Sequence, residues 1–187
     1  MVTIGITGTL GSGKGTVVEY LTREKNFKHY SVRDLLREEL AKRKMPVNRD
    51  TLTAIANTLR AKHGPAYLVE QLFLRARDAN INCIIESIRT PGEVETLRKH
   101  ENFYLLAVDA DTRLRYKRIR SRNSETDQVS YQKFIQNEER EMHSTDSNKQ
   151  NLAACIHLAD YVIVNNGSLM NLHRSIEDFL KAKKLSL

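Results

Sequence analysis

Nine consecutive residues near the N-terminus have the types and spacing to bind a chain of phosphates. They follow an apolar run and open an amphipathic stretch, in the order Gly8, Thr9, Leu10, Gly11, Ser12, Gly13, Lys14, Gly15 and Thr16. Glycines let the backbone curl so that successive N–H groups point at phosphate oxygens, and a helix N-terminus adds partial positive charge. Lys14 is then placed to reach the β- and γ-phosphates of a nucleotide. We therefore predict an ATP-binding P-loop formed by Gly8, Gly11, Ser12, Gly13, Lys14, Gly15 and Thr16.

The residue after Lys14 departs from the commonest form of this loop. It is Gly15 where a Ser or Thr usually stands, so the hydroxyl that faces Mg²⁺ is displaced by one position, to Thr16. We expect Thr16 to be a metal contact. This Gly-Lys-Gly-Thr form resembles the loop of adenylate kinase and related nucleoside monophosphate kinases.

A second segment continues the resemblance after the next strand-like run. Residues 31–37 read Ser-Val-Arg-Asp-Leu-Leu-Arg, which is similar to the Thr-Gly-Asp-Met-Leu-Arg segment of adenylate kinases. In that family the last Arg holds the phosphate of the acceptor. The resemblance implies that Arg37 binds the acceptor phosphate and that Asp34 belongs to the same substrate-binding segment. A solvated Arg on a charged helix face is the alternative interpretation.

A third segment, residues 86–91, resembles the Asp-Gly-Phe-Pro-Arg-Thr motif of the same kinases. The resemblance implies that Arg89 is a second acceptor-phosphate ligand. Glu86, one methylene longer than the Asp of the family, then stands where that Asp orients metal-bound water. The carboxyl ends of strands in such sheets are where ligands bind, which supports this placement. A loop or helix-capping role is the alternative for Arg89.

An Arg-rich run, residues 112–122, follows the fourth strand-like segment. Arg118 and Arg122 are four residues apart and therefore share one helix face. In the matching segment of adenylate kinases the first Arg packs on the adenine and the second contacts the transferring phosphate. The resemblance implies catalytic roles, because phosphoryl transfer depends on cations around the γ-phosphate. A solvated basic face or a nucleic-acid patch is the alternative; Tyr116 alone is available for base stacking, so we do not expect a nucleic-acid partner.

The C-terminal residues 159–169 resemble the last strand and following turn of dephospho-CoA kinases. The similarity extends over nearly the whole chain and is closest to small archaeal P-loop kinases called adenylate-kinase-related or dephospho-CoA-kinase-like. It implies ATP- and Mg²⁺-dependent phosphorylation of a nucleoside monophosphate or a similar small-molecule nucleotide acceptor. Two alternatives remain open, namely phosphorylation of dephospho-CoA and a non-kinase ATP-binding or ATPase module with a regulatory role. Phosphorylation of dephospho-CoA is disfavoured because residues 31–34 lack the Asp-x-Asp with which dephospho-CoA kinases activate a hydroxyl.

Apolar runs of strand length alternate with longer amphipathic stretches, which is the pattern of βα units around a parallel sheet. The predicted strands are residues 2–7, 28–31, 83–86, 103–109 and 161–165. Their continuous apolar character predicts burial on both faces. We therefore predict a P-loop NTPase fold, an α/β three-layer α/β/α sandwich with a five-stranded parallel sheet.

Helices are predicted over residues 15–25, 32–42, 50–63, 66–78, 92–99, 112–122, 131–143, 150–158 and 169–183. Three of them fall between the second and third strands, more than a βαβ crossover requires. Residues 32–80 are therefore expected to form an acceptor-binding helical insertion. Residues 112–143 are expected to form a lid, short and helical, since residues 123–129 leave no room for a large one and no Cys cluster indicates zinc. Arg140 is either a further lid cation or part of a surface salt bridge.

The length of 187 residues, with 40% hydrophobic and 28% charged residues, predicts one compact globular domain, residues 1–187. Apolar runs are far shorter than the ~20 residues of a membrane span. The N-terminus shows no signal-peptide pattern, which favours a cytoplasmic protein. Cys83 and Cys155 are expected to be buried, reduced thiols. The net charge of +7 suits nucleic acid or small polyphosphates equally. The acceptor's base and sugar and the oligomeric state are left open.

Overall fold

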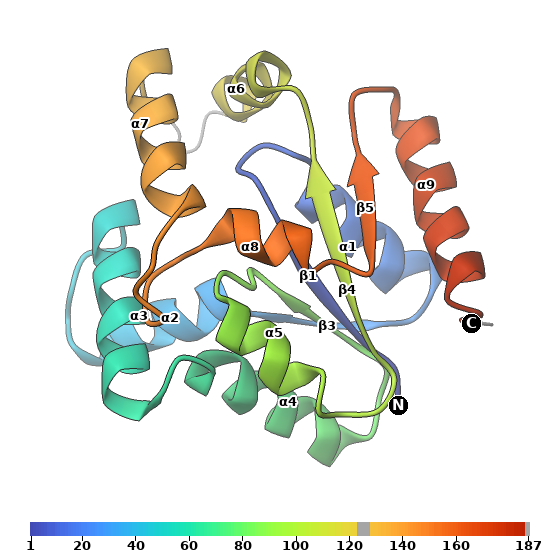
Figure 1. The fold of residues 1–187 in the computed structure, drawn as a ribbon, viewed down its shortest axis with the longest axis horizontal. Coiled ribbons are helices and arrows are strands. Elements are labelled where there is room, and N and C mark those ends of the chain that lie inside the picture. Colours follow the sequence, from blue (N-terminus) through green and yellow to red (C-terminus); the bar gives the residue numbers. More distant parts are fainter. Residues whose placement is uncertain (123–127, 186–187) are drawn as a thin grey trace.

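Five parallel strands form one sheet in the computed structural model, which describes residues 1–122 and 128–185. The strand order is β2-β3-β1-β4-β5 (Figure 1). Thr3 in the central strand pairs with Cys83 on one side and with Phe103 on the other. The predicted five-stranded parallel sheet is therefore confirmed. The strands are β1 (Thr3–Gly8), β2 (Lys28–Ser31), β3 (Cys83–Glu86), β4 (Phe103–Asp109) and β5 (Tyr161–Val164).

Nine helices fill the connections within the described part of the chain, with bounds within two residues of those predicted. They are α1 (Lys14–Glu24), α2 (Val32–Lys42), α3 (Arg49–His63), α4 (Tyr67–Ala79), α5 (Pro91–Leu97), α6 (Thr112–Ser121), α7 (Tyr131–Met142), α8 (Leu152–His157) and α9 (Leu169–Ala182).

Polar caps fix where the helices beside the sheet's carboxyl edge begin. The hydroxyl of Ser31 accepts a hydrogen bond from the backbone N–H of Asp34 and so starts α2. Asn48 and Thr51 form a reciprocal capping box at α3, and Thr90 forms one with Glu93 at α5. Each cap satisfies backbone donors that the first helical turn leaves unpaired. The start of each helix, and with it the direction of its first side chains, is thus set by local sequence.

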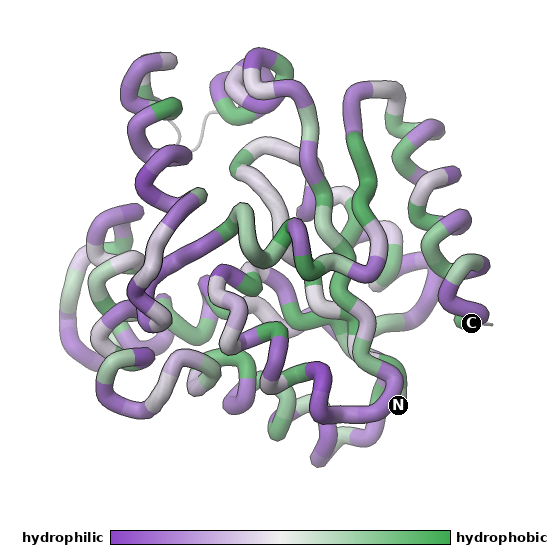
Figure 2. Tube along the Cα trace, in the orientation of Figure 1, coloured by the Kyte–Doolittle hydropathy of each residue, from purple (hydrophilic) through white to green (hydrophobic). Residues whose placement is uncertain are grey.

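The two faces of the sheet are covered by different sets of helices. Residues of α2, α3, α4, α5 and α8 share one core, and residues of α1 and α9 share the other. In β4, Leu105 packs into the first core whereas Leu106 and Val108 pack into the second, and none of the three is exposed. Figure 2 shows hydrophobic residues concentrated in the sheet and α6 and α7 largely hydrophilic. The predicted burial on both faces is confirmed for β1, β3 and β4, whereas the edge strands β2 and β5 have exposed residues such as Lys28 and Val164.

Helices α6 and α7 lie beyond the edge at which β4 and β5 end (Figure 1). They fall within the expected lid, residues 112–143, of which residues 123–127 lie outside the described part. Helices α2, α3 and α4 occupy the connection from β2 to β3, where the helical insertion was predicted.

Both cysteines, Cys83 and Cys155, are buried and free, as predicted. None of the helices described has the length and apolar character needed to cross a membrane.

Candidate functional site

A cavity of about 740 Å³ lies at the carboxyl edge of the sheet. This volume is within the roughly 300–1,000 Å³ typical of small-molecule sites. The cavity brings together residues from the P-loop, the end of β3, and α6. Those among the predicted site residues are Gly11, Gly13, Lys14, Gly15, Thr16, Glu86, Arg89, Arg118 and Arg122. Gly8 and Ser12 are buried within the loop itself.

Two glycines of the P-loop are required by the close approach of neighbouring elements. Gly11 has φ +80°, and a Cβ there would lie 2.6 Å from the carbonyl oxygen of Arg115. Gly13 has φ +107°, and a Cβ there would lie 2.3 Å from Nδ2 of Asn165. Both positions combine a left-handed backbone with a close neighbour, so any side chain at either of them would strain the loop.

Side chains from α6 and from the end of β5 hold the loop in this path. The Asn165 amide donates to the carbonyl of Ser12 at 2.8 Å. Nη1 of Arg118 approaches the same carbonyl at 3.5 Å, and Nη1 of Arg115 approaches the carbonyl of Leu10 at 3.4 Å. The loop is therefore fixed by contacts with residues more than 100 positions away in the sequence.

The ammonium group of Lys14 is folded back onto the loop. Its Nζ donates to the carbonyls of Gly8, at 2.9 Å, and Thr9, at 2.7 Å. The pKa of Lys14 is lowered to about 7, chiefly by burial and also by the charges of Arg89 and Arg122, while Glu86 and Glu141 act in the opposite direction. Phosphate oxygens would bring further negative charge beside this buried group and favour its ammonium form.

Glu86 and Thr16 line the same cavity and suit a magnesium ion that arrives with a nucleotide. Burial opposes ionisation of Glu86, but a hydrogen bond from His29 and the charges of Lys14 and Arg89 hold its pKa below the ordinary value. Among the described residues no group of three or more His, Cys, Asp or Glu side chains could hold a metal by itself. Mg²⁺ commonly takes only one or two protein ligands together with substrate phosphates and water, so one carboxylate and one hydroxyl fit.

The turn after β3 positions Arg89 through a strained backbone. Ser87 has φ +75°, in the left-handed region that favours glycine, where the resembled motif carries Gly. The backbone N–H groups of Ser87 and Ile88 both donate to the carbonyl of Ile6, at 3.1 and 3.2 Å. Such strain costs roughly 1–2 kcal/mol and persists only where the surrounding structure imposes it. Residue 87 therefore fixes the direction in which the chain reaches Arg89.

Arg49 and Glu141 line the cavity although the sequence did not indicate them. Glu141 contacts Arg89, and Arg49 contacts Glu141. Nε and Nη2 of Arg49 donate to Oε1 of Glu141 at 3.1 and 2.6 Å. Nη1 of Arg89 donates to Oε2 of Glu141 at 3.1 Å. Arg49 begins α3 and Glu141 lies near the end of α7, so no local pattern connects them.

Arg60 is a third cavity residue that the sequence did not indicate, and it supports the same turn through Glu93. It is 1% exposed and donates through Nε and Nη2 to Oε1 of the fully buried Glu93, at 3.0 and 2.7 Å. The other oxygen of Glu93 accepts from the backbone N–H groups of Arg89 and Thr90. Nη1 of Arg60 is buried and has no hydrogen-bond partner among the described residues. Because Arg60 lines the cavity, a bound ligand could satisfy this donor.

The structure does not bring Asp34 and Arg37 to the cavity. Nη1 of Arg37 lies 3.3 Å from Oδ1 of Asp34, and the two side chains are 51% and 62% exposed. Helix α2 lines the cavity with Val32, Arg33 and Leu36 instead. The tertiary placement of α2 therefore differs from the one that the motif suggested for these two side chains.

Arg140 forms a salt bridge and is not among the cavity residues. Its Nη1 lies 3.5 Å from Oδ1 of Asp50 at the start of α3. Of the two interpretations made from sequence, the structure supports the surface ion pair.

The fold and the site define a P-loop protein with a kinase-like α/β sheet. The sequence profile AAA_18, described as an AAA domain, matches residues 4–146, and the chain belongs to that domain family. Solved structures similar to it over almost their full lengths include TT1252 from Thermus thermophilus, at 23% identity and a TM-score of 0.63 over 100% of this chain and 98% of that one. The dephospho-CoA kinase from Campylobacter jejuni has 15% identity and a TM-score of 0.53 over 97% and 96% of the two chains.

A relative from Methanococcus vannielii, called UPF0200 protein, is 31% identical over 182 residues, which cover 95% of this chain and 94% of the relative. The chain is therefore a member of the UPF0200 family.

Proposed function

We propose that this protein is an ATP-dependent phosphotransferase that moves the γ-phosphoryl group to the phosphate of a nucleoside monophosphate or a similar nucleotide. The observation that carries the proposal is that the P-loop and Arg89 line one cavity, together with Arg118 and Arg122. Seven basic and three acidic side chains line this cavity, a balance that suits two phosphorylated substrates held side by side.

The described residues divide into roles by position. Lys14 and the P-loop backbone bind the β- and γ-phosphates, while Arg118 and Arg122 reach the cavity from α6 and stabilise charge on the phosphoryl group in transfer. Arg89 meets the acceptor phosphate from the opposite side. Thr16 and Glu86 would hold Mg²⁺, which neutralises phosphate charge when bound.

A phosphate acceptor is favoured over a hydroxyl acceptor. A hydroxyl needs a general base, whereas a phosphate is already ionised and needs cations to bring it close to ATP. The carboxylate of residues 31–34, Asp34, lies outside the cavity lining and pairs with Arg37. The similarity to a dephospho-CoA kinase therefore supports the fold of the proposed enzyme and leaves dephospho-CoA as the second acceptor to test.

The proposal is tested by incubating the protein with radiolabelled ATP, Mg²⁺ and a panel of ribo- and deoxyribonucleoside monophosphates and dephospho-CoA. We expect label on one or more monophosphates and its loss in Lys14→Ala. Lys117→Ala removes an exposed lysine of α6 and serves as the control.

Melting temperatures separate this function from its alternatives. ATP with Mg²⁺ should raise the melting temperature of the wild type, because a ligand that binds only the folded state stabilises it, and an oligonucleotide should not. Stabilisation by ATP without transfer to any acceptor would support a nucleotide-binding module and contradict the proposed kinase. Transfer at the wild-type rate by Lys14→Ala would contradict the assignment of the P-loop.

A further inference from the structure

Three charged side chains from distant parts of the chain meet at one point of the cavity. They are Arg49 at the start of α3, Arg89 after β3, and Glu141 on α7. Arg49 approaches one carboxylate oxygen of Glu141 and Arg89 approaches the other, so both oxygens are held by guanidinium groups. The side chains of Arg49 and Arg89 are 24% and 21% exposed and that of Glu141 is 9% exposed.

The carboxylate at this point is ionised despite its burial. Burial raises the pKa of Glu141, but the charges of Arg89 and Arg49 and a hydrogen bond from Arg49 bring it below the ordinary value. Two guanidinium groups that converge on one anion form the arrangement that binds phosphate oxygens through parallel hydrogen bonds. A phosphate monoester carries about twice the charge of a carboxylate and three acceptor oxygens, so it suits the same pair of guanidinium groups better.

This anion-binding point is close to the P-loop. The charges of Arg89 and Glu141 both act on the ammonium group of Lys14, and all three residues line the same cavity. An anion held by Arg49 and Arg89 would therefore lie beside the phosphates of a nucleotide on the P-loop.

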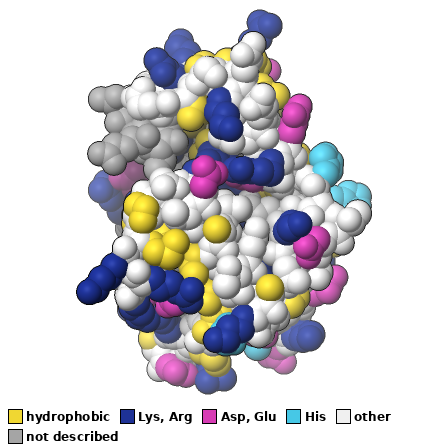
Figure 3. All heavy atoms as spheres, turned by 90° about the vertical axis from the view of Figure 1, so that its left-hand side faces the viewer, with side chains coloured by type: hydrophobic (Ala, Val, Ile, Leu, Met, Phe, Trp, Pro, Cys, Tyr) yellow, Lys and Arg dark blue, Asp and Glu magenta, His cyan; other side chains and the backbone are white. Residues whose placement is uncertain are grey.

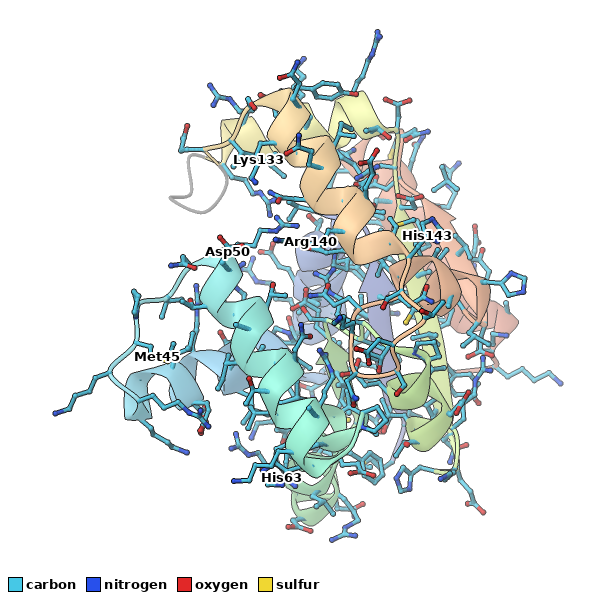
Figure 4. All side chains as sticks on the ribbon, turned by 60° about the vertical axis from the view of Figure 1, so that its left-hand side comes forward. Met45, Asp50, His63, Lys133, Arg140 and His143 are labelled. Carbon is cyan, nitrogen blue, oxygen red and sulfur yellow. The ribbon has the colours of Figure 1, made fainter. Side chains whose placement is uncertain are left out.

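A second ion pair ties α7 to α3 next to the first. Asp50 follows Arg49 on α3 and Arg140 precedes Glu141 on α7, with Nη1 of Arg140 3.5 Å from Oδ1 of Asp50. Figure 4 shows Asp50 and Arg140 approaching one another from the two helices. Figure 3 shows the face on the side of α3 and α7, where basic and acidic side chains lie side by side. The Asp50–Arg140 pair is exposed and stabilises little by itself, so Glu141 is the main ionic contact between these two helices.

We propose that Arg49 and Arg89 together bind the monophosphate of the acceptor, and that Glu141 occupies this position in competition with it. The inference rests on the proposed function, because it names the residues that hold the acceptor of that reaction. It replaces Arg37, which lies outside the cavity lining, with Arg49, which lines it. When the phosphate displaces Glu141, α7 loses its main ionic contact with α3.

The test is calorimetric titration of the full-length protein with each nucleoside monophosphate in turn. The P-loop is first saturated with a non-hydrolysable ATP analogue and Mg²⁺, so that the titrant reports on the acceptor side. Arg49→Ala should weaken binding of the monophosphate about tenfold or more, which is typical for one lost charged contact. Arg49→Lys keeps the positive charge but loses the paired N–H donors of the guanidinium group. Its affinity for the monophosphate should lie between those of Arg49→Ala and wild type. Arg43→Ala, an exposed arginine paired with Glu39, is the matched control and should bind like wild type.

Glu141→Gln tests the competition. Removing the charge frees both guanidinium groups, so the affinity for the monophosphate should rise severalfold, whereas Glu139→Gln, an exposed neighbour on α7, should change nothing. Unchanged or weaker binding by Glu141→Gln would overturn the competition. Circular dichroism melts of every variant show whether a loss of binding is a loss of fold.

The outcomes separate this inference from the proposed function. Phosphoryl transfer with wild-type acceptor KM and affinity in Arg49→Ala would overturn the inference and leave the kinase intact, as would a loss seen in Arg37→Ala instead. Monophosphate binding that depends on Arg49 without any phosphoryl transfer would support the anion site and contradict the kinase. No binding of any monophosphate by wild type or Glu141→Gln would overturn the inference.

Discussion

Nucleotide binding to the P-loop should take up a proton from solution at pH 8. The reason lies in Lys14, whose pKa is lowered from 10.5 to about 7, chiefly by burial and also by the charges of Arg89 and Arg122. In the free protein most Lys14 side chains are then neutral at pH 8. A triphosphate beside Nζ favours the ammonium form and returns the pKa toward its ordinary value.

The size of the uptake follows from these pKa values. With a pKa of about 7, roughly one molecule in eleven carries the Lys14 proton at pH 8, so complete protonation on binding takes up about 0.9 protons. The complex binds more protons than the free protein, so the affinity for the nucleotide must fall as pH rises. The association constant should drop by a factor of about eight to ten between pH 8 and pH 9.

The assay is isothermal titration calorimetry with ATP and Mg²⁺ at pH 8 in two buffers of different ionisation enthalpy, whose difference in observed heat gives the proton uptake. Phosphate groups have a second pKa of about 6 and are already ionised at this pH, so they contribute little. Lys14→Arg is the matched control, because a guanidinium stays charged and should remove the uptake. Equal uptake by wild type and Lys14→Arg would refute the reasoning.

Two predictions concern stability and are measured by urea denaturation. Gly13→Ala should lower the free energy of unfolding by roughly 1–3 kcal/mol, because residue 13 has φ +107° and the new Cβ would lie 2.3 Å from the Asn165 amide. Gly15→Ala, at a helical position with nothing within 4 Å, should be neutral or stabilise by up to about 1 kcal/mol. A larger loss of stability in Gly15→Ala than in Gly13→Ala would contradict the strain assigned to residue 13. Arg60→Ala should cost about 3–5 kcal/mol, since it leaves the buried Glu93 carboxylate without its guanidinium partner. Arg75→Ala, which removes one member of an exposed pair with Glu38, should cost less than about 1 kcal/mol, and equal effects would show that the buried pair matters no more than the exposed one.

The fold and the P-loop could be predicted from sequence because their signals are local. The strands are continuous apolar runs, and the helices begin at polar caps such as Ser31 and Thr90. The loop from Gly8 to Thr16 is one contiguous segment whose spacing fixes its chemistry. The motif match of residues 86–91 predicts Arg89, which does line the cavity, and the position after a strand supports it because ligands of such sheets bind at that edge.

The contacts among the cavity residues proposed to bind the acceptor could not be predicted in the same way. Arg49 and Glu141 are 92 residues apart, and their contact depends on how α7 lies against α3. The motif match predicts Arg37, but the direction of a side chain on α2 depends on how that helix packs. Arg37 pairs with Asp34 outside the cavity lining. Arg60 lies in the middle of an amphipathic helix, where its sequence context is that of an ordinary exposed arginine. Its burial depends on Glu93, 33 residues further along the chain.

The contacts that hold the P-loop have a consequence for how fast a nucleotide can bind. Arg115, Arg118 and Asn165 fix the carbonyls of Leu10 and Ser12 while Lys14 fixes those of Gly8 and Thr9. The conformational entropy of this loop is therefore lost during folding, and binding does not have to order it again. Association should be governed by diffusion and by the attraction of a basic cavity for a polyphosphate. Its rate constant should then fall steeply as salt is added, while the dissociation rate changes little.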